Sequence, residues 1–336
     1  MDTKFLEEML STMSVSGHEE ELQDKVVEHV KDFAEEIIRD ATGNVISVIN
    51  PESDKKILLS GHIDEIGIII SNITSDGFIH VIKAGGIRPV LYLGTHVTIK
   101  NKNGIVNGVV VTNGDLTSNA KVKDSDLIID IGASSKEEAL KYVSIGDSVC
   151  ASTTYHYLIG DRMAARAMDD RIGAFIVTEV LRKAKERGCK TGVYALTAAG
   201  EETTCRGAYW GSQRVKPDEA FAIDVTFATD YPGTNPNTSG DIKIGGGPAI
   251  CHSSIVSKKM NNRLFELADK LNIKTQEEVS PAYTYTDADK IHFSNDGVPV
   301  ALVSIPLRYM HSSIELLSLK DVEEIIDLLV EYVCTY

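Results

Sequence analysis

The sequence predicts an α/β fold with a small β domain inserted into it. Strand and helix patterns follow one another up to about residue 66 and again from about residue 156 onward, which is typical of a sheet flanked by helices. The segment between them consists of short β-rich runs with the hairpin signals Asp76-Gly77 and Asn103-Gly104. A chain of 336 residues also exceeds the usual size of one core. We therefore expect one domain over residues 1–66 and 156–336, and a second over residues 67–155.

The first part of the α/β domain is expected to contain a helix and then a buried strand. Ser16-Gly17-His18-Glu19 predicts a capping box, and the apolar residues after it recur at helical spacing, namely Leu22, Val26, Val30 and Phe33. Lys56 to Gly61 has the length and apolarity of a buried strand. His62 is therefore expected at the carboxyl end of a strand.

The second part continues the alternation of helices and strands. A helix is predicted from Asp170 to Arg187, and a strand from Val193 to Thr197. The apolar runs Ala220 to Asp224 and Val298 to Ile305 predict two more strands, and a last helix follows Ser318. Open α/β sheets bind ligands beyond the carboxyl ends of their strands. Residues that follow these strands are therefore expected to converge.

Charge and composition exclude several classes of function. Asp and Glu number 49 against 34 Lys and Arg, giving a net charge of −15, which repels phosphate backbones and anionic lipid surfaces. No apolar run approaches a membrane span in length. We expect a cytoplasmic protein without nucleic-acid or membrane partners. The five cysteines are scattered and form no Cys-x-x-Cys pair, which argues against a disulfide framework and against a thiolate zinc site.

Histidines and carboxylates are concentrated at or near the ends of the predicted strands. Divalent transition metals bind imidazole and carboxylate groups, and a two-metal site needs a carboxylate that bridges both ions. Of two adjacent glutamates after a strand, one can bind a metal while the other transfers protons. The sequence therefore predicts a metal hydrolase, with the candidate residues His62, Asp64, Asp169, Glu201, Glu202, Asp224 and His311.

Each candidate also has an ordinary interpretation. Asp169-Asp170-Arg171 fits the acidic first turn of a helix, Glu201-Glu202 fits a solvated loop, and His311 fits a loop histidine. In the functional interpretation, Asp169 faces the metals, Asp170 pairs with Arg171, and Asp64 holds the ring of His62. Other hydrolytic chemistry has little support, because the chain contains no His-Glu-x-x-His helix, no Gly-x-Ser-x-Gly elbow and no phosphate-binding loop.

In combination, the motifs resemble those of the M42 family of metalloaminopeptidases. The resemblance covers nearly the whole chain, including Gly85-Gly86 and Asp130-Ile131-Gly132-Ala133 in the inserted segment. The motifs in the α/β domain are Gly61-His62-Ile63-Asp64-Glu65-Ile66-Gly67, Ala167-Met168-Asp169-Asp170-Arg171, Gly200-Glu201-Glu202, Ala222-Ile223-Asp224-Val225-Thr226 and Arg308-Tyr309-Met310-His311-Ser312.

The resemblance implies a zinc-peptidase-like catalytic domain, a mixed sheet flanked by helices, with an inserted barrel-like β domain that serves oligomerisation. It implies two zinc or cobalt ions per subunit, with manganese as another suitable metal. His62 and Asp224 would bind one ion and Glu202 and His311 the other, with Asp169 bridging. Glu201 would be the general base that acts on a metal-activated water, and Asp64 would support His62. The implied substrates are peptides with a free N-terminus, and the implied assembly is a homododecamer.

One segment departs from the family pattern, and two other functions stay open. Thr203-Thr204-Cys205 stands where the family usually has Val-Gly-Leu, so the loop behind Glu202 loses a flexible glycine. This departure motivates the alternative of a catalytically silent peptide-binding or assembly protein with the same fold. The other alternative is a metal-independent glycosidase, which requires two carboxyl groups across a sugar. Adjacent glutamates with histidine partners fit metal binding better.

Overall fold

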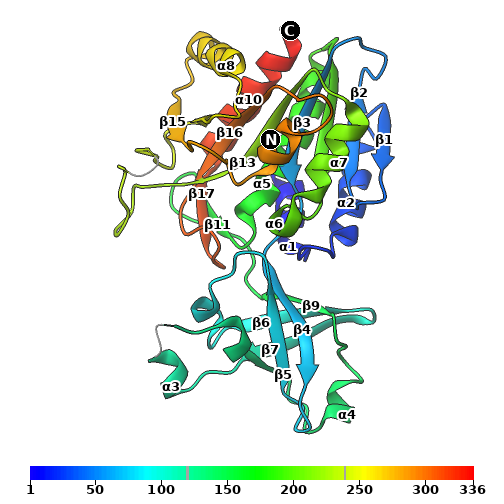
Figure 1. The fold of residues 1–336 in the computed structure, drawn as a ribbon, viewed down its shortest axis with the longest axis vertical. Helices are drawn as coiled ribbons and strands as arrows, with labels where there is room; N and C mark the ends of the chain where they lie inside the picture. Colours follow the sequence, from blue (N-terminus) through cyan, green and yellow to red (C-terminus); the bar gives the residue numbers. More distant parts are fainter. Residues whose placement is uncertain (119–120, 238–239) are drawn as a thin grey trace.

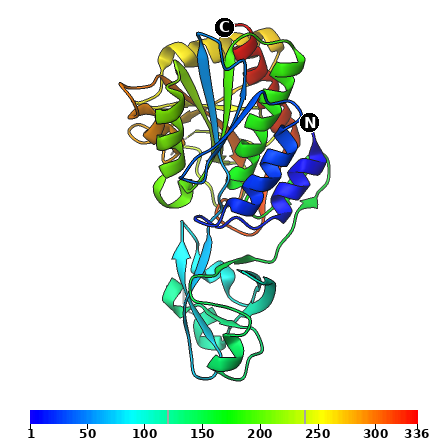
Figure 2. The ribbon, with the colours of Figure 1, turned by 90° about the vertical axis from the view of Figure 1, so that its right-hand side faces the viewer.

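The computed structural model describes residues 1–118, 121–237 and 240–336. It consists of a mixed α/β domain and a closed six-stranded barrel, as the sequence predicts. In Figure 1 the sheet and its helices form the upper part and the barrel the lower part, and Figure 2 shows the same two parts from the side. Among the described residues, no helix is long and apolar enough to cross a membrane.

The main sheet has eight strands, and its centre is parallel. The pairs β12–β3, β3–β13 and β13–β16 are parallel, so the carboxyl ends of these four strands meet at one edge of the sheet. All four are buried on nearly every residue because helices cover both faces. In sheet order the strands are β1 (Glu36–Arg39), β2 (Val45–Ile49), β12 (Gly192–Ala198), β3 (Lys56–His62), β13 (Glu219–Phe227), β16 (Val300–Leu307), β14 (Ala249–His252) and β15 (Gln276–Val279).

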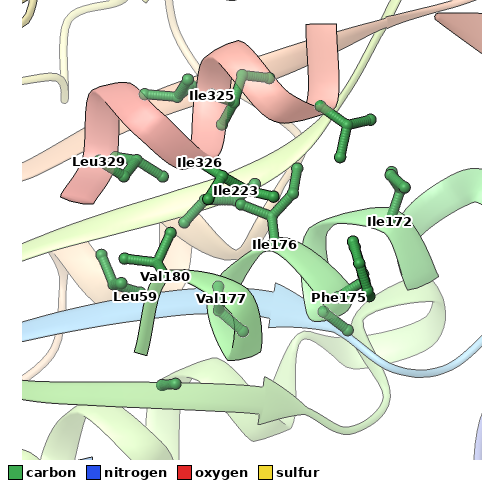
Figure 3. Packing of buried hydrophobic residues seen from close by; sticks show 14 of the residues in the cluster. Leu59, Ile172, Phe175, Ile176, Val177, Val180, Ile223, Ile325, Ile326 and Leu329 are labelled. Atoms are coloured by element: carbon green, nitrogen blue, oxygen red, sulfur yellow. The ribbon is translucent and has the colours of Figure 1, made fainter. Parts of the chain in front are cut away.

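Helices pack on the two faces of this sheet through separate apolar clusters. One face is covered by α1 (Thr3–Ser11), α2 (Glu20–Val30), α5 (Met168–Glu186), α8 (Lys258–Leu271) and α10 (Leu319–Cys334). The other face is covered by α7 (Arg206–Val215) and α9 (Asp287–His292). Figure 3 shows the first cluster, in which Ile176 of α5 lies near Ile223 of β13 and Ile326 of α10. This packing fixes the start of α5 against the carboxyl edge of the sheet.

The inserted segment forms the barrel with strand order β4–β5–β8–β7–β6–β9. Both predicted hairpin turns are present, one between β4 and β5 and the other between β6 and β7. The strands are β4 (Gly67–Ile73), β5 (Ile79–Ala84), β6 (His96–Asn101), β7 (Gly104–Val110), β8 (Ile128–Asp130) and β9 (Ser148–Ala151). Short helical turns connect them, namely η1 (Pro89–Tyr92), α3 (Gly114–Thr117), η2 (Asp124–Asp126) and α4 (Lys136–Ala139).

A small three-stranded sheet pairs two segments of the chain that lie next to the site. It pairs β10 (His156–Tyr157) with β11 (Arg162–Ala165) and β11 with β17 (Glu315–Ser318), all antiparallel. The register places Ala165 opposite Glu315. This pairing brings the segment after His311 beside the segment that leads into α5.

Two local predictions are wrong, and in both cases tertiary pairing explains the difference. The predicted capping box is absent, because the Oγ of Ser16 lies 2.9 Å from the Oγ1 of Thr203 and α2 begins only at Glu20. A bridge between Val15 and Glu65 holds this segment against the loop after β3. Asp224 does not end its strand, because β13 continues to Phe227 through pairing with β16.

Candidate dinuclear metal centre

The candidate site begins at the carboxyl end of β3, where His62 is the last residue. The side chain of His62 is 2% exposed. Its Nδ1 lies 3.1 Å from the backbone oxygen of Asp64 and 3.4 Å from Asp64 Oδ1. Both oxygens are acceptors, so in the neutral ring Nδ1 keeps the proton and Nε2 presents a lone pair. Nε2 lies 3.2 Å from Oδ1 of Asp169.

Asp169, in the first turn of α5, lies between the two candidate histidines. Its Oδ1 faces Nε2 of His62, and its Oδ2 lies 3.3 Å from Nε2 of His311. Glu315, which is 1% exposed, fixes the main chain at both Asp169 and His311. One of its oxygens accepts the backbone N–H of Asp169 at 3.1 Å and the other accepts that of His311 at 2.8 Å. A carboxylate with one oxygen toward each imidazole has the arrangement that bridging two ions requires.

The expected pair between Asp170 and Arg171 is absent. Asp170 accepts hydrogen bonds from the backbone N–H groups of His62 at 3.1 Å and of Gly173 at 3.0 Å. Arg171 instead forms an ion pair with Glu65, which also pairs with the Arg166 guanidinium. The start of α5 therefore directs Asp170 toward β3 and Arg171 toward the loop after β3, so the two side chains serve different neighbours.

Asp64 positions the two adjacent glutamates as well as His62. The backbone N–H of Glu201 donates to Asp64 Oδ1 at 3.0 Å, and that of Glu202 donates to Oδ2 at 3.2 Å. These glutamates begin the short helix α6 (Glu201–Thr204). Glu201 Oε2 lies 3.7 Å from Nε2 of His62, whereas Glu202 Oε2 lies 4.0 Å from Nε2 of His311. The adjacent carboxylates therefore point to different histidines.

His311 is oriented by a residue that follows the barrel strand β5. Its Nδ1 lies 3.0 Å from the backbone oxygen of Gly86. The carbonyl can only accept, so Nδ1 carries the proton and Nε2 faces Asp169 and Glu202. A Cβ on Gly86 would lie 2.7 Å from the Cε1 and Nδ1 atoms of this ring. The close approach thus requires a glycine, and the inserted segment contributes directly to the site.

All five predicted ligands lie together in two overlapping groups. In each group, one donor atom per residue lies within 4.8 Å of the others. The first group is His62, Asp169 and Asp224, and the second is Asp169, Glu202 and His311. Asp169 belongs to both groups. This is the partition that the family resemblance implies.

Two observations indicate that these donors suit divalent cations. Oε1 of Glu202 is buried and has no hydrogen-bond partner among the described residues. Burial and the negative charge of Asp169 raise the pKa values of Glu202 and Asp224 well above their usual range. Carboxylates crowded in this way repel one another, and cations placed between them remove the repulsion.

Glu201 and His62 also have shifted pKa values. Burial raises the pKa of Glu201 to about 8, with further contributions from the carboxylates of Asp287 and Asp64. Burial would lower the pKa of His62, but hydrogen bonds to Asp169 and Asp64 raise it well above its usual value. A pKa near neutral suits a group that accepts and returns a proton, and a cation beside Glu201 would favour its carboxylate form.

Sequence reasoning missed Glu315 and Asp287, and it noted Gly86 only as part of the family resemblance. Glu315 interrupts the apolar run Ile314–Leu317, and an acid within such a run was an available signal. Asp287 lies at the start of α9, where its Oδ2 accepts a hydrogen bond from Ser60 Oγ at 2.8 Å. Its first-turn position is ordinary for an aspartate, so the sequence offered no signal for its approach to Glu201.

Four of the five candidate ligands, Asp169, Glu202, Asp224 and His311, line a cavity of about 1080 Å³. The cavity also extends along the end of β13, the β15 edge and the loop that precedes α9. Large apolar side chains line it away from the donors, namely Phe227, Val279, Tyr283, Tyr285 and Phe293. The site therefore has space for a substrate much larger than a single amino acid.

Histidines and carboxylates around a shared aspartate, at the carboxyl edge of an α/β sheet, form a donor set typical of metal-dependent hydrolases. The family model described as M42 glutamyl aminopeptidase matches residues 43–328. The chain therefore belongs to the M42 family of aminopeptidases, which confirms the resemblance of its motifs.

Individual relatives match over nearly their whole length. A protein of Acetivibrio thermocellus, provisionally named an aminopeptidase, is 36% identical over 98% of this chain and 97% of its own. The lysyl aminopeptidase of Pyrococcus furiosus is 32% identical over 98% of this chain and 95% of its own. The dodecameric TET1 peptidase of Pyrococcus horikoshii superposes with a TM-score of 0.87 at 29% identity, covering 99% of this chain and 98% of its own.

Proposed function

We propose that this chain is an aminopeptidase that uses two divalent metal ions per subunit to remove N-terminal residues from peptides. The observation that carries the proposal is the position of Asp169, with one carboxylate oxygen toward each of two imidazoles. His62 and Asp224 would complete the donors of one ion, and Glu202 and His311 those of the other. Zinc and cobalt suit this set of nitrogen and oxygen donors, and manganese is a third suitable metal.

The ions, when bound, would supply Lewis acidity toward water and toward the scissile carbonyl. The chain supplies the proton transfers. Glu201 is the proposed general base, because its carboxylate adjoins His62 without belonging to either donor group of the centre. It would take a proton from the attacking water and deliver it to the leaving nitrogen. Asp64 would hold both the ring of His62 and the backbone of Glu201 in place.

We also propose that copies of this chain self-associate, as a homododecamer in which the inserted domain over residues 67–155 takes part. The dodecameric state of the TET1 neighbour supports this proposal. Apolar side chains exposed on the barrel support it too, among them Ile82, Val90 and Ile105. Peptides with a free N-terminus are the proposed substrates, and a cytoplasmic location stays a prediction of the sequence.

Metal removal and a Glu201→Gln substitution test the proposed mechanism together. Dialysis against a chelator should abolish peptide hydrolysis, and zinc or cobalt should restore it. Glu201→Gln should bind two ions per chain, as measured by elemental analysis, yet lose about 100-fold or more in kcat, because a glutamine cannot transfer the proton. Unchanged hydrolysis in Glu201→Gln would remove this residue from the mechanism. Glycan hydrolysis that survives chelation would favour the glycosidase alternative instead.

A further inference from the structure

A third group of potential ligands lies next to the proposed metal centre. It consists of Glu201, of Cys205 between α6 and α7, and of Asp287 at the start of α9. One donor atom of each lies within 4.8 Å of the others. The Sγ of Cys205 lies 3.5 Å from Oε1 of Glu201. In a tetrahedral zinc site, a sulfur ligand at about 2.3 Å and an oxygen ligand at about 2.1 Å lie about 3.6 Å apart, so the observed spacing suits one ion.

Asp287 gives independent support for a cation site. Its side chain is 2% exposed, and its Oδ2 accepts a hydrogen bond from Ser60. Its Oδ1 is buried and has no hydrogen-bond partner among the residues that the structure describes. Leaving a buried carboxylate oxygen unpaired is costly.

The cluster concentrates negative charge in a place that ions can reach. Burial raises the pKa of Asp287 to about 6. Burial, with the charges of Glu201 and Asp287, also raises the pKa of the Cys205 thiol above its usual value. A dication reverses this effect, because it favours the carboxylates and the thiolate together. Glu201 and Cys205 line the large cavity, so a cation can enter from solvent.

We propose that Glu201, Cys205 and Asp287 bind a third, thiophilic divalent cation, such as Zn²⁺ in excess or Cd²⁺, and that this ion inhibits the enzyme. On binding, the metal–sulfur bond forms and the thiol proton passes to water. Hard cations such as Mg²⁺ do not compete, because thiolate is a soft ligand. Inhibition follows because Glu201, once bound to the ion, is unable to accept a proton. The Thr203-Thr204-Cys205 segment, where the chain departs from the family pattern, supplies the sulfur.

The inhibitory part of this inference rests on the proposed function, whereas the binding part does not. The test therefore measures metal binding in the absence of substrate. Protein that already holds its two catalytic ions is titrated with Cd²⁺. The readouts are the near-ultraviolet absorption of cadmium–thiolate bonds and the total metal per chain. The two proposed catalytic donor groups contain no cysteine, but four other cysteines lie outside the third group, so the diagnostic band is the part of the absorption that requires Cys205. Peptide hydrolysis is measured in parallel.

Three variants locate the bound ion. Cys205→Ser should lose the band and need about 10-fold or more Cd²⁺ for half-inhibition, since loss of even a supporting partner lowers metal affinity about 10- to 100-fold. Asp287→Asn should keep the thiol but weaken binding by a similar factor. Cys334→Ser, which removes a partly exposed thiol that contacts Cys189 outside the cluster, should keep the absorption that requires Cys205.

Three results would overturn the proposal. The first is the absence of a thiolate band from the unchanged protein, and the second is a band in Cys205→Ser as strong as that of the unchanged protein. The third is Cd²⁺ affinity in Asp287→Asn equal to that of the unchanged protein, which would indicate a lone thiol. If the band and the third equivalent of metal appear in protein that hydrolyses no peptide, the cation site stands and the proposed aminopeptidase mechanism fails.

Discussion

A single methyl group at Gly86 should disable the metal centre without unfolding the protein. The Cβ of an alanine would lie 2.7 Å from two ring atoms of His311, whereas ordinary contacts begin at about 3.4 Å. The ring must therefore retreat by about 0.7 Å. Metal–ligand distances tolerate about 0.2 Å, and misplacement by about 1 Å costs about 100-fold in rate. We expect Gly86→Ala to lose roughly 10- to 100-fold in kcat/KM, or about 1.4 to 2.7 kcal/mol.

The assay compares Gly86→Ala with Gly114→Ala. A Cβ on Gly114, in the barrel domain, meets nothing within 4 Å, so this variant controls for the addition of a methyl group. Hydrolysis of a short peptide, bound metal per chain and urea unfolding are measured for both. Unfolding is compared in metal-free protein, because bound metal itself stabilises the fold. Full activity with two bound ions in Gly86→Ala would refute the placement of His311.

Three further outcomes follow from the same geometry. Glu65→Gln should lower the free energy of unfolding by about 3–5 kcal/mol at pH 7, because it leaves the buried Arg166 and Arg171 without a counter-charge. Burial raises the pKa of the Glu65 carboxyl, but the charges of Arg166 and Arg171 hold it below its usual value. The contribution of Glu65 to the free energy of unfolding is therefore complete above about pH 4.3 and is lost as pH falls through the folded pKa. Urea unfolding that shows the same difference between Glu65→Gln and the unchanged protein from pH 7 to pH 3 would contradict this. Asp64→Asn should lower kcat by about 10- to 100-fold while both ions stay bound. The reason is that the amide nitrogen of asparagine cannot accept a hydrogen bond from a backbone N–H, as the carboxylate oxygen does. An unchanged kcat would exclude the positioning role. Hydrolysis should also decline at acid pH, because the histidine and carboxylate ligands must be deprotonated to hold metal, and a full rate with retained metal near pH 4 would disprove this.

Much of the fold and the core of the site were predictable from local sequence patterns. His62 and the Glu201-Glu202 pair follow apolar strands, and parallel strands bring their carboxyl ends to one edge. The principle that places ligands at that edge needs only the order of strands and helices along the chain. The same reasoning does not give the role of Gly86, because its contact with His311 joins residues that are 225 positions apart. Glu315 stands out as an acid within an apolar run, but its hydrogen bond to Asp169, 146 positions away, is encoded by no local pattern.

Where predictions were wrong, a distant partner competed with a local one. Ser16 has the sequence of a helix cap, yet its hydroxyl contacts Thr203. Arg171 follows Asp170 in the chain, yet its guanidinium pairs with Glu65. In both cases a local motif offers a hydrogen bond of modest strength, and burial beside a partner far along the chain determines the contact that forms.

The most direct test of the central claim is mass spectrometry of a peptide mixture incubated with zinc- or cobalt-loaded protein. Half of the peptides carry a free N-terminus and half are N-acetylated. We predict loss of single N-terminal residues from the free half alone, and the residues released would define the side-chain preference. Cleavage of neither half would contradict the account and favour a catalytically silent protein, whereas cleavage within both halves would exclude an aminopeptidase.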